Sequence, residues 1–339
     1  MNINTTNVVF IMLKTILLLM VHISSCMGMN VVGWWVGSPD NPHFPIDKLN
    51  WDAYTHIRFG GPSHHPNGTV YCNKTDDTFQ RVLKIAHSHD VKVQWGCGIE
   101  NIHDVLWNPD KVYLRNNYID TIGDAVRECG ADGIELDYEF GDSKHMNVGI
   151  VTSDESTHYS QLLADIKTSV GPDKIVSADV SIWGIAPGNW ILGVLPWVNT
   201  TMLNRGDFDF INTMSYHWNK DGNIWSWKKD AWFIDKWGID RKRVHIGIPY
   251  FSMNRTKKLK PYNEPTWGGL SALCPNIDPK ENVCDGVVFV GKQMNEDIGR
   301  WVKEEGFGGV FPWAANYDSI EHNNTLVSWL KKGLGGLTV

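Results

Sequence analysis

Residues 132–139, with the sequence DGIELDYE, constrain the fold of this chain more than any other stretch. Apolar and acidic residues alternate along it, with Ile134, Leu136 and Tyr138 set against Glu135, Asp137 and Glu139. A period of two is the period of a β-strand, so the three carboxylates share one face, about 7 Å apart. Like charges on one face repel each other, and a structural strand has no reason to keep them. We therefore interpret this segment as a strand whose acidic face points into a site.

Strand-like runs alternate with amphipathic helical runs along the rest of the chain. We predict strands at residues 31–35, 55–59, 92–96, 133–138, 175–181, 208–215, 244–249 and 309–313. Helices are predicted at residues 77–89, 111–129, 155–170, 227–237, 292–305 and 320–332. This order predicts an α/β protein with a single closed (β/α)8 TIM barrel and right-handed crossovers. Chemistry in such barrels lies at the C-terminal ends of the strands, which is where Glu139 falls.

The first residues are typical of a secretory signal peptide. Residues 8–23 are almost wholly apolar apart from Lys14, and small residues follow. The run is short for a membrane-spanning helix, which needs about 20 residues, but the lack of Lys or Arg before it leaves an uncleaved anchor open. We expect a signal peptide at residues 1–28 and one catalytic domain at residues 29–339.

Glycosylation motifs agree with the secretory route. Asn-x-Ser/Thr sequons occur at Asn67, Asn73, Asn199, Asn254 and Asn323. Behind a signal peptide they predict a glycoprotein that is secreted or lumenal, including a lysosome-like compartment. The net charge of -7 argues against a nucleic-acid or anionic-membrane partner. The 17 Trp residues suit stacking against sugar faces as well as core packing.

Five cysteines remain after removal of the signal peptide with Cys26. Cys274 and Cys284 flank one short loop, and we predict a disulfide between them. A pairing of Cys72 with Cys97 is a second expectation, and Cys129, in a helix-like run, is predicted to be a buried free thiol. No Cys or His spacing indicates zinc, so we expect neither a metal nor a cofactor.

Several motifs together resemble those of glycoside hydrolase family 18, which includes chitinases, chitobiases and endo-β-N-acetylglucosaminidases. Residues 132–139 resemble the family's DGxDxDxE signature, and the resemblance extends over nearly the whole mature chain. Residues 95–98 are similar to the SxGG motif, residues 214–217 to MxYD, and residues 309–318 to the last-strand motif whose Trp forms the floor of the sugar site. Three departures stand out: Glu135 replaces an Asp, His217 replaces the Asp of MxYD, and Gln94 and Cys97 leave only the glycines of SxGG.

The resemblance implies a role for each matching residue. Glu139 is expected to be the general acid and then the general base, and Asp137 to orient the substrate acetamide and balance its positive charge. Tyr216 is expected to hydrogen-bond the acetamide oxygen. Further substrate-binding candidates are Glu135, Met214, Trp313, Trp183 and Trp218.

Three points concern the barrel interior. We hypothesise that Glu135 and Asp137 share a proton. The effect of this sharing would pass to Glu139 as the Asp137 side chain turns toward the acetamide, and the raised pKa of Glu139 would keep that residue protonated. Strand alternation requires either Trp34 or Trp35 to point into the barrel and leaves open which. Asp179 on the fifth predicted strand is expected in the polar interior.

The resemblance implies a monomeric, secreted glycosidase that hydrolyses β-1,4-linked N-acetylglucosamine in chitin or chitooligosaccharides. Cleavage is expected with retention, through an oxazolinium ion formed by the substrate's own acetamide. Residues 250–307 leave little room for the full α+β insertion domain of some members, which predicts a shallow groove. Alternatives are a non-catalytic chitinase-like lectin that binds N-acetylglucosamine oligomers, and an endo-β-N-acetylglucosaminidase acting on the N-glycan chitobiose core. An unrelated barrel hydrolase would need a second carboxylate near Glu139 as nucleophile.

Overall fold

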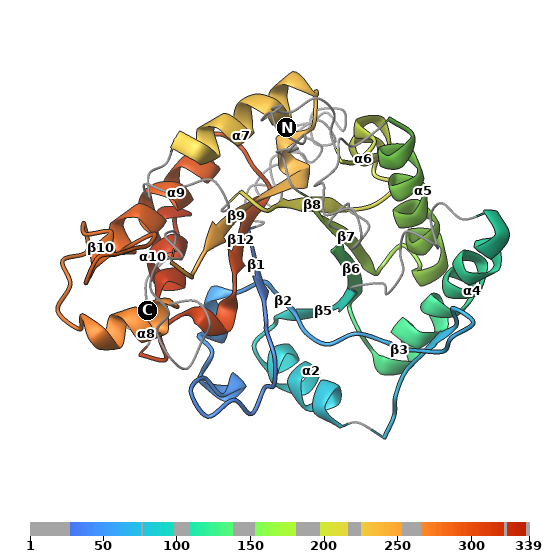
Figure 1. Cartoon of the computed structure of the whole chain (residues 1–339), viewed down its shortest axis with the longest axis horizontal. Helices are drawn as coiled ribbons and strands as arrows, with labels where there is room; N and C mark the ends of the chain where they lie inside the picture. The colour runs from blue at the N-terminus through green and yellow to red at the C-terminus, as the bar shows by residue number, and fades with distance from the viewer. Residues whose placement is uncertain are drawn as a thin grey trace, which may run out of the picture.

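A computed structural model describes residues 28–75, 77–97, 109–137, 153–180, 197–215, 225–252, 266–321 and 324–336. Parallel strands close into a barrel in the order β1-β12-β9-β8-β7-β6-β5-β2, seen end-on in Figure 1. They are β1 (Asn30–Trp34), β2 (His56–Arg58), β5 (Lys92–Cys97), β6 (Gly133–Asp137), β7 (Ile175–Val180), β8 (Phe210–Thr213), β9 (Val244–Pro249) and β12 (Gly309–Trp313). The predicted (β/α)8 TIM barrel is confirmed.

Helices surround the barrel and bury their apolar faces against it (Figure 1). They are α2 (Thr78–Ser88), α4 (Val112–Cys129), α5 (Ser153–Val170), α6 (Thr200–Arg205), α7 (Trp225–Lys236), α8 (Trp267–Leu273), α9 (Lys292–Glu304) and α10 (Leu326–Gly333). The last one begins six residues later than the predicted helix at 320–332. The reason is Asp318, whose carboxylate accepts hydrogen bonds from the backbone N–H groups of Leu326 and Val327 at 2.8 and 3.0 Å and so fixes a turn before the helix.

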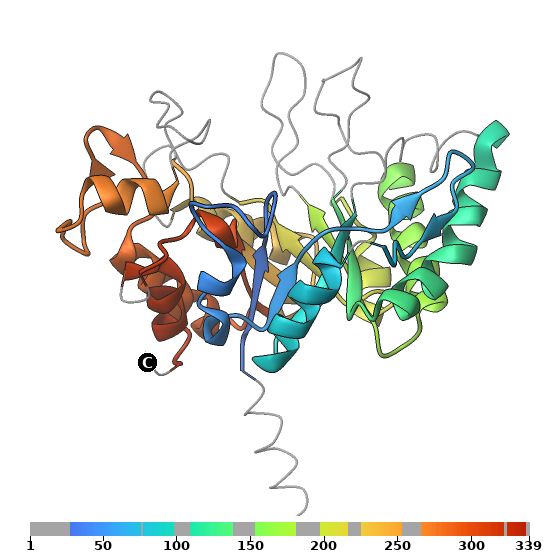
Figure 2. The same cartoon turned by 90° about the horizontal axis from the view of Figure 1, so that it is seen from below.

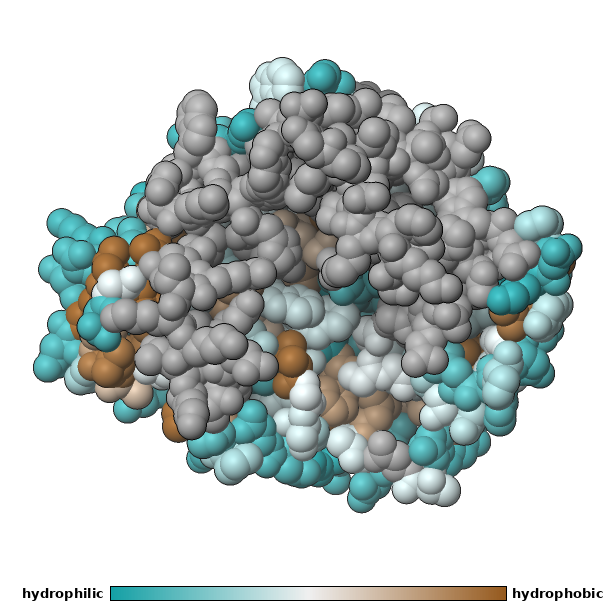
Figure 3. All heavy atoms as spheres, viewed as in Figure 1, coloured by the Kyte–Doolittle hydropathy of each residue, from teal (hydrophilic) through white to brown (hydrophobic). Residues whose placement is uncertain are grey.

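Two small antiparallel hairpins lie outside the barrel, and the sequence patterns did not predict them. One pairs β3 (Ser63–His64) with β4 (Val70–Tyr71), and the other pairs β10 (Val283–Cys284) with β11 (Val287–Val288). The second hairpin and α8 form the orange segment beside the barrel in Figure 2. Figure 3 shows hydrophobic residues gathered over it, where Leu273 and Val283 are about half exposed. In the described part of residues 250–307, this segment of one short helix and one hairpin is present and a full insertion domain is not.

The disulfides confirm one prediction and correct two others. Cys274 and Cys284 are bonded, as expected. The pairing of Cys72 with Cys97 and the free thiol at Cys129 are both wrong, because Cys72 is bonded to Cys129 with a Cα–Cα distance of 5.5 Å. The chain after β4 packs against α4 and brings Cys72 to the last turn of that helix, whereas Cys97 ends a barrel strand.

Aspartates that precede strands anchor the N-terminal end of the barrel. The Asp132 carboxylate accepts from the Val93 backbone N–H at 2.7 Å and so joins β6 to β5. Asp209 does the same before β8, accepting from the Val176 backbone N–H at 2.7 Å. The first acid of residues 132–139 therefore has a structural role.

The predicted signal peptide lies outside the described residues, apart from Gly28. Among the residues that the structure describes, no helix is long and apolar enough to span a membrane.

A buried histidine at the start of β2 makes the stability depend on pH. Burial, and then the nearby charges of Lys92 and Arg58, lower the pKa of His56 to about 4. The unfolded chain binds this proton near pH 6.5, so the stabilisation is complete above pH 6.5 and is lost as the pH falls towards 4. We expect the free energy of unfolding to fall less steeply in His56→Gln than in the wild type over this window, by up to about 1.4 kcal/mol per pH unit. Urea unfolding of both proteins at pH 7, 6 and 5 measures the difference, and parallel curves would contradict the prediction.

Candidate active site

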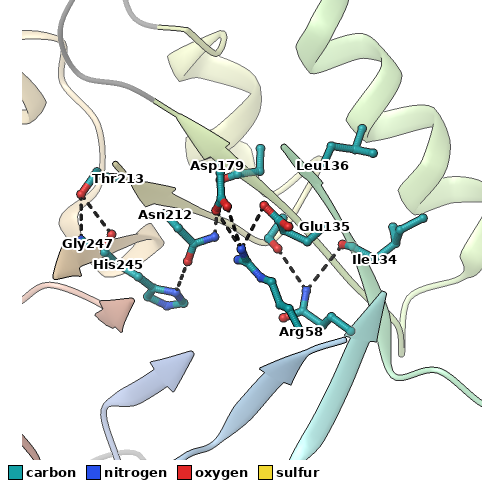
Figure 4. Close-up of polar contacts among 12 residues, drawn as sticks. Arg58, Ile134, Glu135, Leu136, Asp179, Asn212, Thr213, His245 and Gly247 are labelled. Atoms are coloured by element: carbon teal, nitrogen blue, oxygen red, sulfur yellow. Dashed lines mark hydrogen bonds and ion pairs between the residues drawn. The ribbon is translucent and has the colours of Figure 1, made fainter. Parts of the chain in front are cut away.

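A buried ionic cluster lies inside the barrel, where three strands meet (Figure 4). Arg58, the last residue of β2, points its guanidinium between β6 and β7. Its Nη1 donates to both carboxylate oxygens of Asp179, at 2.8 and 3.0 Å, and lies 3.0 Å from Oε1 of Glu135. All three side chains are 0–1% exposed. Both carboxylates thus contact the same nitrogen of one cation.

Glu135 is a carboxyl of this cluster whose pKa is raised. Burial raises its pKa well above the usual range, and the negative charges of Asp179 and Asp137 raise it further. The positive charge of Arg58 opposes this rise without cancelling it. The expected proton sharing between Glu135 and Asp137 remains a hypothesis. Glu135 contacts Arg58, and the charge of Asp179 affects its pKa more than the charge of Asp137 does.

Aromatic rings cover the cluster. The Arg58 guanidinium carbon lies 4.6 Å from the centre of the Phe311 ring and 5.4 Å from the Trp34 ring. The Trp34 ring in turn lies 4.9 Å from that of Trp313, tilted by 36°. Both indoles are only partly buried, so an aromatic surface lies between the buried charges and the outside.

The structure decides which of the two adjacent tryptophans belongs to the site. Trp34 faces Trp313, while Trp35 is 3% exposed and packs edge-on against Phe44 in the core. Gly96, in the segment similar to SxGG, leaves room for the Trp34 ring, because a Cβ at this position would lie 2.9 Å from its Cη2.

Neutral polar groups complete the interior below the cluster. Gln94 donates to the Ser177 hydroxyl at 3.0 Å. Asn212 Oδ1 lies 2.9 Å from Nδ1 of His245 (Figure 4). Burial lowers the pKa of His245 well below its ordinary value, with smaller contributions from His56 and then Arg58. This layer therefore adds no positive charge near neutral pH.

The predicted site residues divide into a described and an undescribed group. Asp137 ends β6 and is partly buried, Met214 follows β8 and is 5% exposed, and Trp313 ends β12. Asp179 is buried in the interior, as expected. The remaining candidates lie outside the described residues: Glu139, Tyr216, His217, Trp183 and Trp218.

Sequence reasoning missed Arg58. Its neighbours Ile57 and Phe59 are apolar, so Arg58 lies on the opposite face of the strand from them. This alternation is the signal that Arg58 faces the interior of the barrel. A charged residue at such a position needs an opposite charge nearby, and the sequence did not identify which carboxylate would supply it.

A cavity of about 510 Å³ lies between α8 and the segments after β1 and β12. Asn316 forms part of its wall and is fixed by hydrogen bonds to the backbone of Val36. Burial raises the pKa of Asp318, also in the wall, to about 7, although three backbone N–H groups oppose the rise. None of the site residues predicted from the sequence lines this cavity, so we do not assign the chemistry to it.

The arrangement is suited to proton transfer and to binding an uncharged ring. A buried carboxyl with a raised pKa lies on β6, a second buried carboxyl lies on β7, and partly exposed indoles cover the cation that joins them. Within the described residues, no group of three or more His, Cys, Asp or Glu side chains is placed to hold a metal ion.

Comparisons with known proteins agree with this geometry. The model of the family "Glycosyl hydrolases family 18" matches residues 30–318. A "chitinase-like effector" of Moniliophthora roreri is 24% identical over 251 residues, which are 67% of this chain and 58% of that relative. The chain thus spans less than two thirds of the relative's length.

Solved structures share the fold. A chitinase from Bacteroides thetaiotaomicron has a TM-score of 0.69 at 17% identity, covering 90% of this chain and 96% of its own. A plant class V chitinase mutant from Cycas revoluta, in complex with (GlcNAc)3, has a TM-score of 0.68 at 16% identity, covering 90% and 99%. At these identities the likeness shows the fold alone.

Proposed function

This chain belongs to the glycosyl hydrolases of family 18, and we propose that it hydrolyses β-1,4-linked N-acetylglucosamine in chitin or chitooligosaccharides. The observation that carries the proposal is the position of Asp137 at the C-terminal end of β6, two residues before Glu139 and in the barrel that presents Trp34 and Trp313. The end of a barrel strand is the usual location of catalytic groups in this fold.

The proposed mechanism uses the substrate's acetamide as the nucleophile. The protonated Glu139 gives its proton to the leaving glycosidic oxygen while the acetamide oxygen bonds to the anomeric carbon. The C–O bond to the leaving sugar breaks, and an oxazolinium ion forms. Asp137 balances its positive charge and Tyr216 orients the acetamide oxygen. Glu139, now a carboxylate, takes a proton from water as that water attacks the anomeric carbon. The bond between this carbon and the acetamide oxygen breaks, the acetamide is restored, and the two inversions give overall retention.

Release of a fluorophore from chitobiose and chitotriose glycosides between pH 4 and 8 tests this function. Turnover supports the hydrolase, and the ratio of the two rates begins to map the groove. Binding of chitin oligomers without turnover would reject the proposed hydrolysis. If only an N-glycan core were hydrolysed, the proposed substrate class would be wrong and the proposed reaction type would stand.

A second candidate is a sugar-binding protein without catalysis. One support is the buried ion pair of Glu135 with Arg58, which engages the middle acid of the signature. The other is the relative named "chitinase-like effector". Isothermal titration with chitin oligomers, run beside the turnover assay, separates the two candidates.

We also propose that the chain follows the secretory route, which its two disulfides support. Asn67 and Asn73 lie exposed, and each accepts from the hydroxyl of its own sequon Thr, at 2.8 and 2.7 Å. Asn199 instead caps α6 by accepting from the Met202 backbone N–H and is partly buried.

We therefore expect higher glycan occupancy at Asn67 and Asn73 than at Asn199 in protein secreted from eukaryotic cells. Glycopeptide mass spectrometry with and without an amidase that removes N-glycans measures the occupancy at each site. Asn67→Gln, as a matched variant, should lose the mass of one glycan. Unmodified peptides at both exposed sites would refute the expectation.

A further inference from the structure

The buried guanidinium of Arg58 has a charge environment that hydrophobic packing does not explain. It is 0% exposed, and its contacts with Asp179 and Glu135 all run through Nη1. Its Nε and Nη2 make no hydrogen bond with the described residues, and the rings of Phe311 and Trp34 lie within 5.4 Å of it. Burying a cation with two of its nitrogens unpartnered among the described residues is costly, so stability alone does not account for an arginine at this position.

The strand register brings this cation close to the predicted catalytic strand. Asp137 and Asp179 are Cα partners on the neighbouring strands β6 and β7, so their side chains leave the sheet on the same face. Glu135 lies two positions before Asp137 and therefore also on this face. Two carboxyl groups thus contact the guanidinium, and the register places the third, Asp137, on the same face beside them.

The charges that face Asp137 can be named strand by strand for the described residues. Glu135 precedes it on β6, Asp179 borders it on β7, and Arg58 reaches the pair from β2. Gln94 on β5 and the indoles of β1 and β12 are uncharged. Deeper in the barrel, His56 and His245 have lowered pKa values and stay neutral near pH 7.

We propose that Arg58 is a positioning residue of this site: it holds the two buried carboxyl groups together and supplies the positive charge that keeps Asp137 ionised. With one proton on Glu135, the charges of Arg58 and Asp179 cancel, and Asp137 is the remaining anion. Without the guanidinium, Asp137 faces the uncompensated anion of Asp179 and binds a proton more readily. The effect on catalysis rests on the proposed function, in which an ionised Asp137 offsets the charge of the oxazolinium ion. The effect of Arg58 on the ionisation of Asp137 is independent of that function.

Carbon NMR of the full mature chain labelled at the Asp side-chain carboxyl tests the proposal without any substrate. The Asp137 signal is identified by its loss in Asp137→Asn, and its titration midpoint is then followed. We expect Arg58→Met to raise the midpoint by about one pH unit or more, a tenfold gain in proton affinity. Arg58→Lys keeps a positive nitrogen, and we expect it to stay near the wild type. An unchanged midpoint in Arg58→Met, or equal shifts in the Met and Lys variants, would overturn the proposal.

Two further comparisons keep the test decisive. Arg127→Met removes an exposed arginine of α4 that pairs with Asp124 on the same helix, and it should leave the midpoint unchanged. If Arg58→Met does not fold, Arg58→Met/Asp179→Asn is compared with Asp179→Asn, since both lack the Asp179 charge and they differ only in the arginine. We expect the double variant to have the higher midpoint, and equal midpoints would overturn the proposal.

Turnover separates this proposal from the proposed function. In an active enzyme, Arg58→Met should move the acidic limb of the kcat/KM profile, which reports the free enzyme, to higher pH, in step with the NMR midpoint. Wild-type protein without turnover would reject the hydrolase, yet a raised midpoint in Arg58→Met would still support the role of Arg58. An active enzyme with an unshifted midpoint would reject the role of Arg58 alone.

Discussion

Glu139→Gln is expected to lower kcat for a chitobiose or chitotriose glycoside by about a thousandfold, within the range that general acid–base catalysis contributes. The amide cannot protonate the leaving oxygen, and it cannot take a proton from the attacking water. Its shape is nearly that of the acid, so oligomer binding should persist. Initial rates from pH 4 to 8 measure the loss, and titration calorimetry measures the retained binding.

The matched control for this substitution is Glu128→Gln. It makes the same chemical change at an exposed position of α4, where Glu128 pairs with Lys74 at 3.2 Å on the surface. We expect wild-type turnover from this variant. A Glu139→Gln protein with undiminished kcat would exclude Glu139 as the general acid and redirect attention to another carboxyl of the barrel.

Gly133→Ala is expected to lower the free energy of unfolding by about 3 kcal/mol or more, at the upper end of what overpacking costs. A Cβ at this position would lie 2.2 Å from the carbonyl oxygen of Ile175, its register partner on β7. That oxygen belongs to backbone and cannot move without separating the two strands. Urea unfolding followed by tryptophan fluorescence measures the loss, and failure to unfold cooperatively would agree with it.

Gly269→Ala is the matched control for the backbone clash. This glycine lies in α8, and a Cβ there would meet only the Thr266 hydroxyl at an ordinary 3.6 Å. We expect a stability equal to or slightly above that of the wild type, because alanine favours a helix over glycine. If Gly133→Ala were within about 0.5 kcal/mol of the wild type, the close approach of β6 and β7 would not explain this glycine.

The local sequence pattern was sufficient to predict the barrel and the strand that bears the acidic residues. The alternation in residues 132–139 identifies a strand with one acidic face, because side chains on a strand alternate whatever the strand pairs with. β6 indeed runs from Gly133 to Asp137. The Cys274–Cys284 disulfide was predictable for a similar reason, since the two cysteines lie only ten positions apart in the sequence.

Contacts between distant segments were decided by the closure of the barrel. Arg58 and Asp179 are 121 residues apart, and only the order β2-β5-β6-β7 places both side chains in one interior. Cys72 meets Cys129 because the chain after β4 packs on α4, which no cysteine spacing reveals. The choice of Trp34 over Trp35 likewise depends on which face of β1 turns inward. The sequence by itself determined the strand that carries the acids, since its period is a local property, whereas the tertiary structure decided which cation balances them, since that pairing requires strands far apart in the chain to meet.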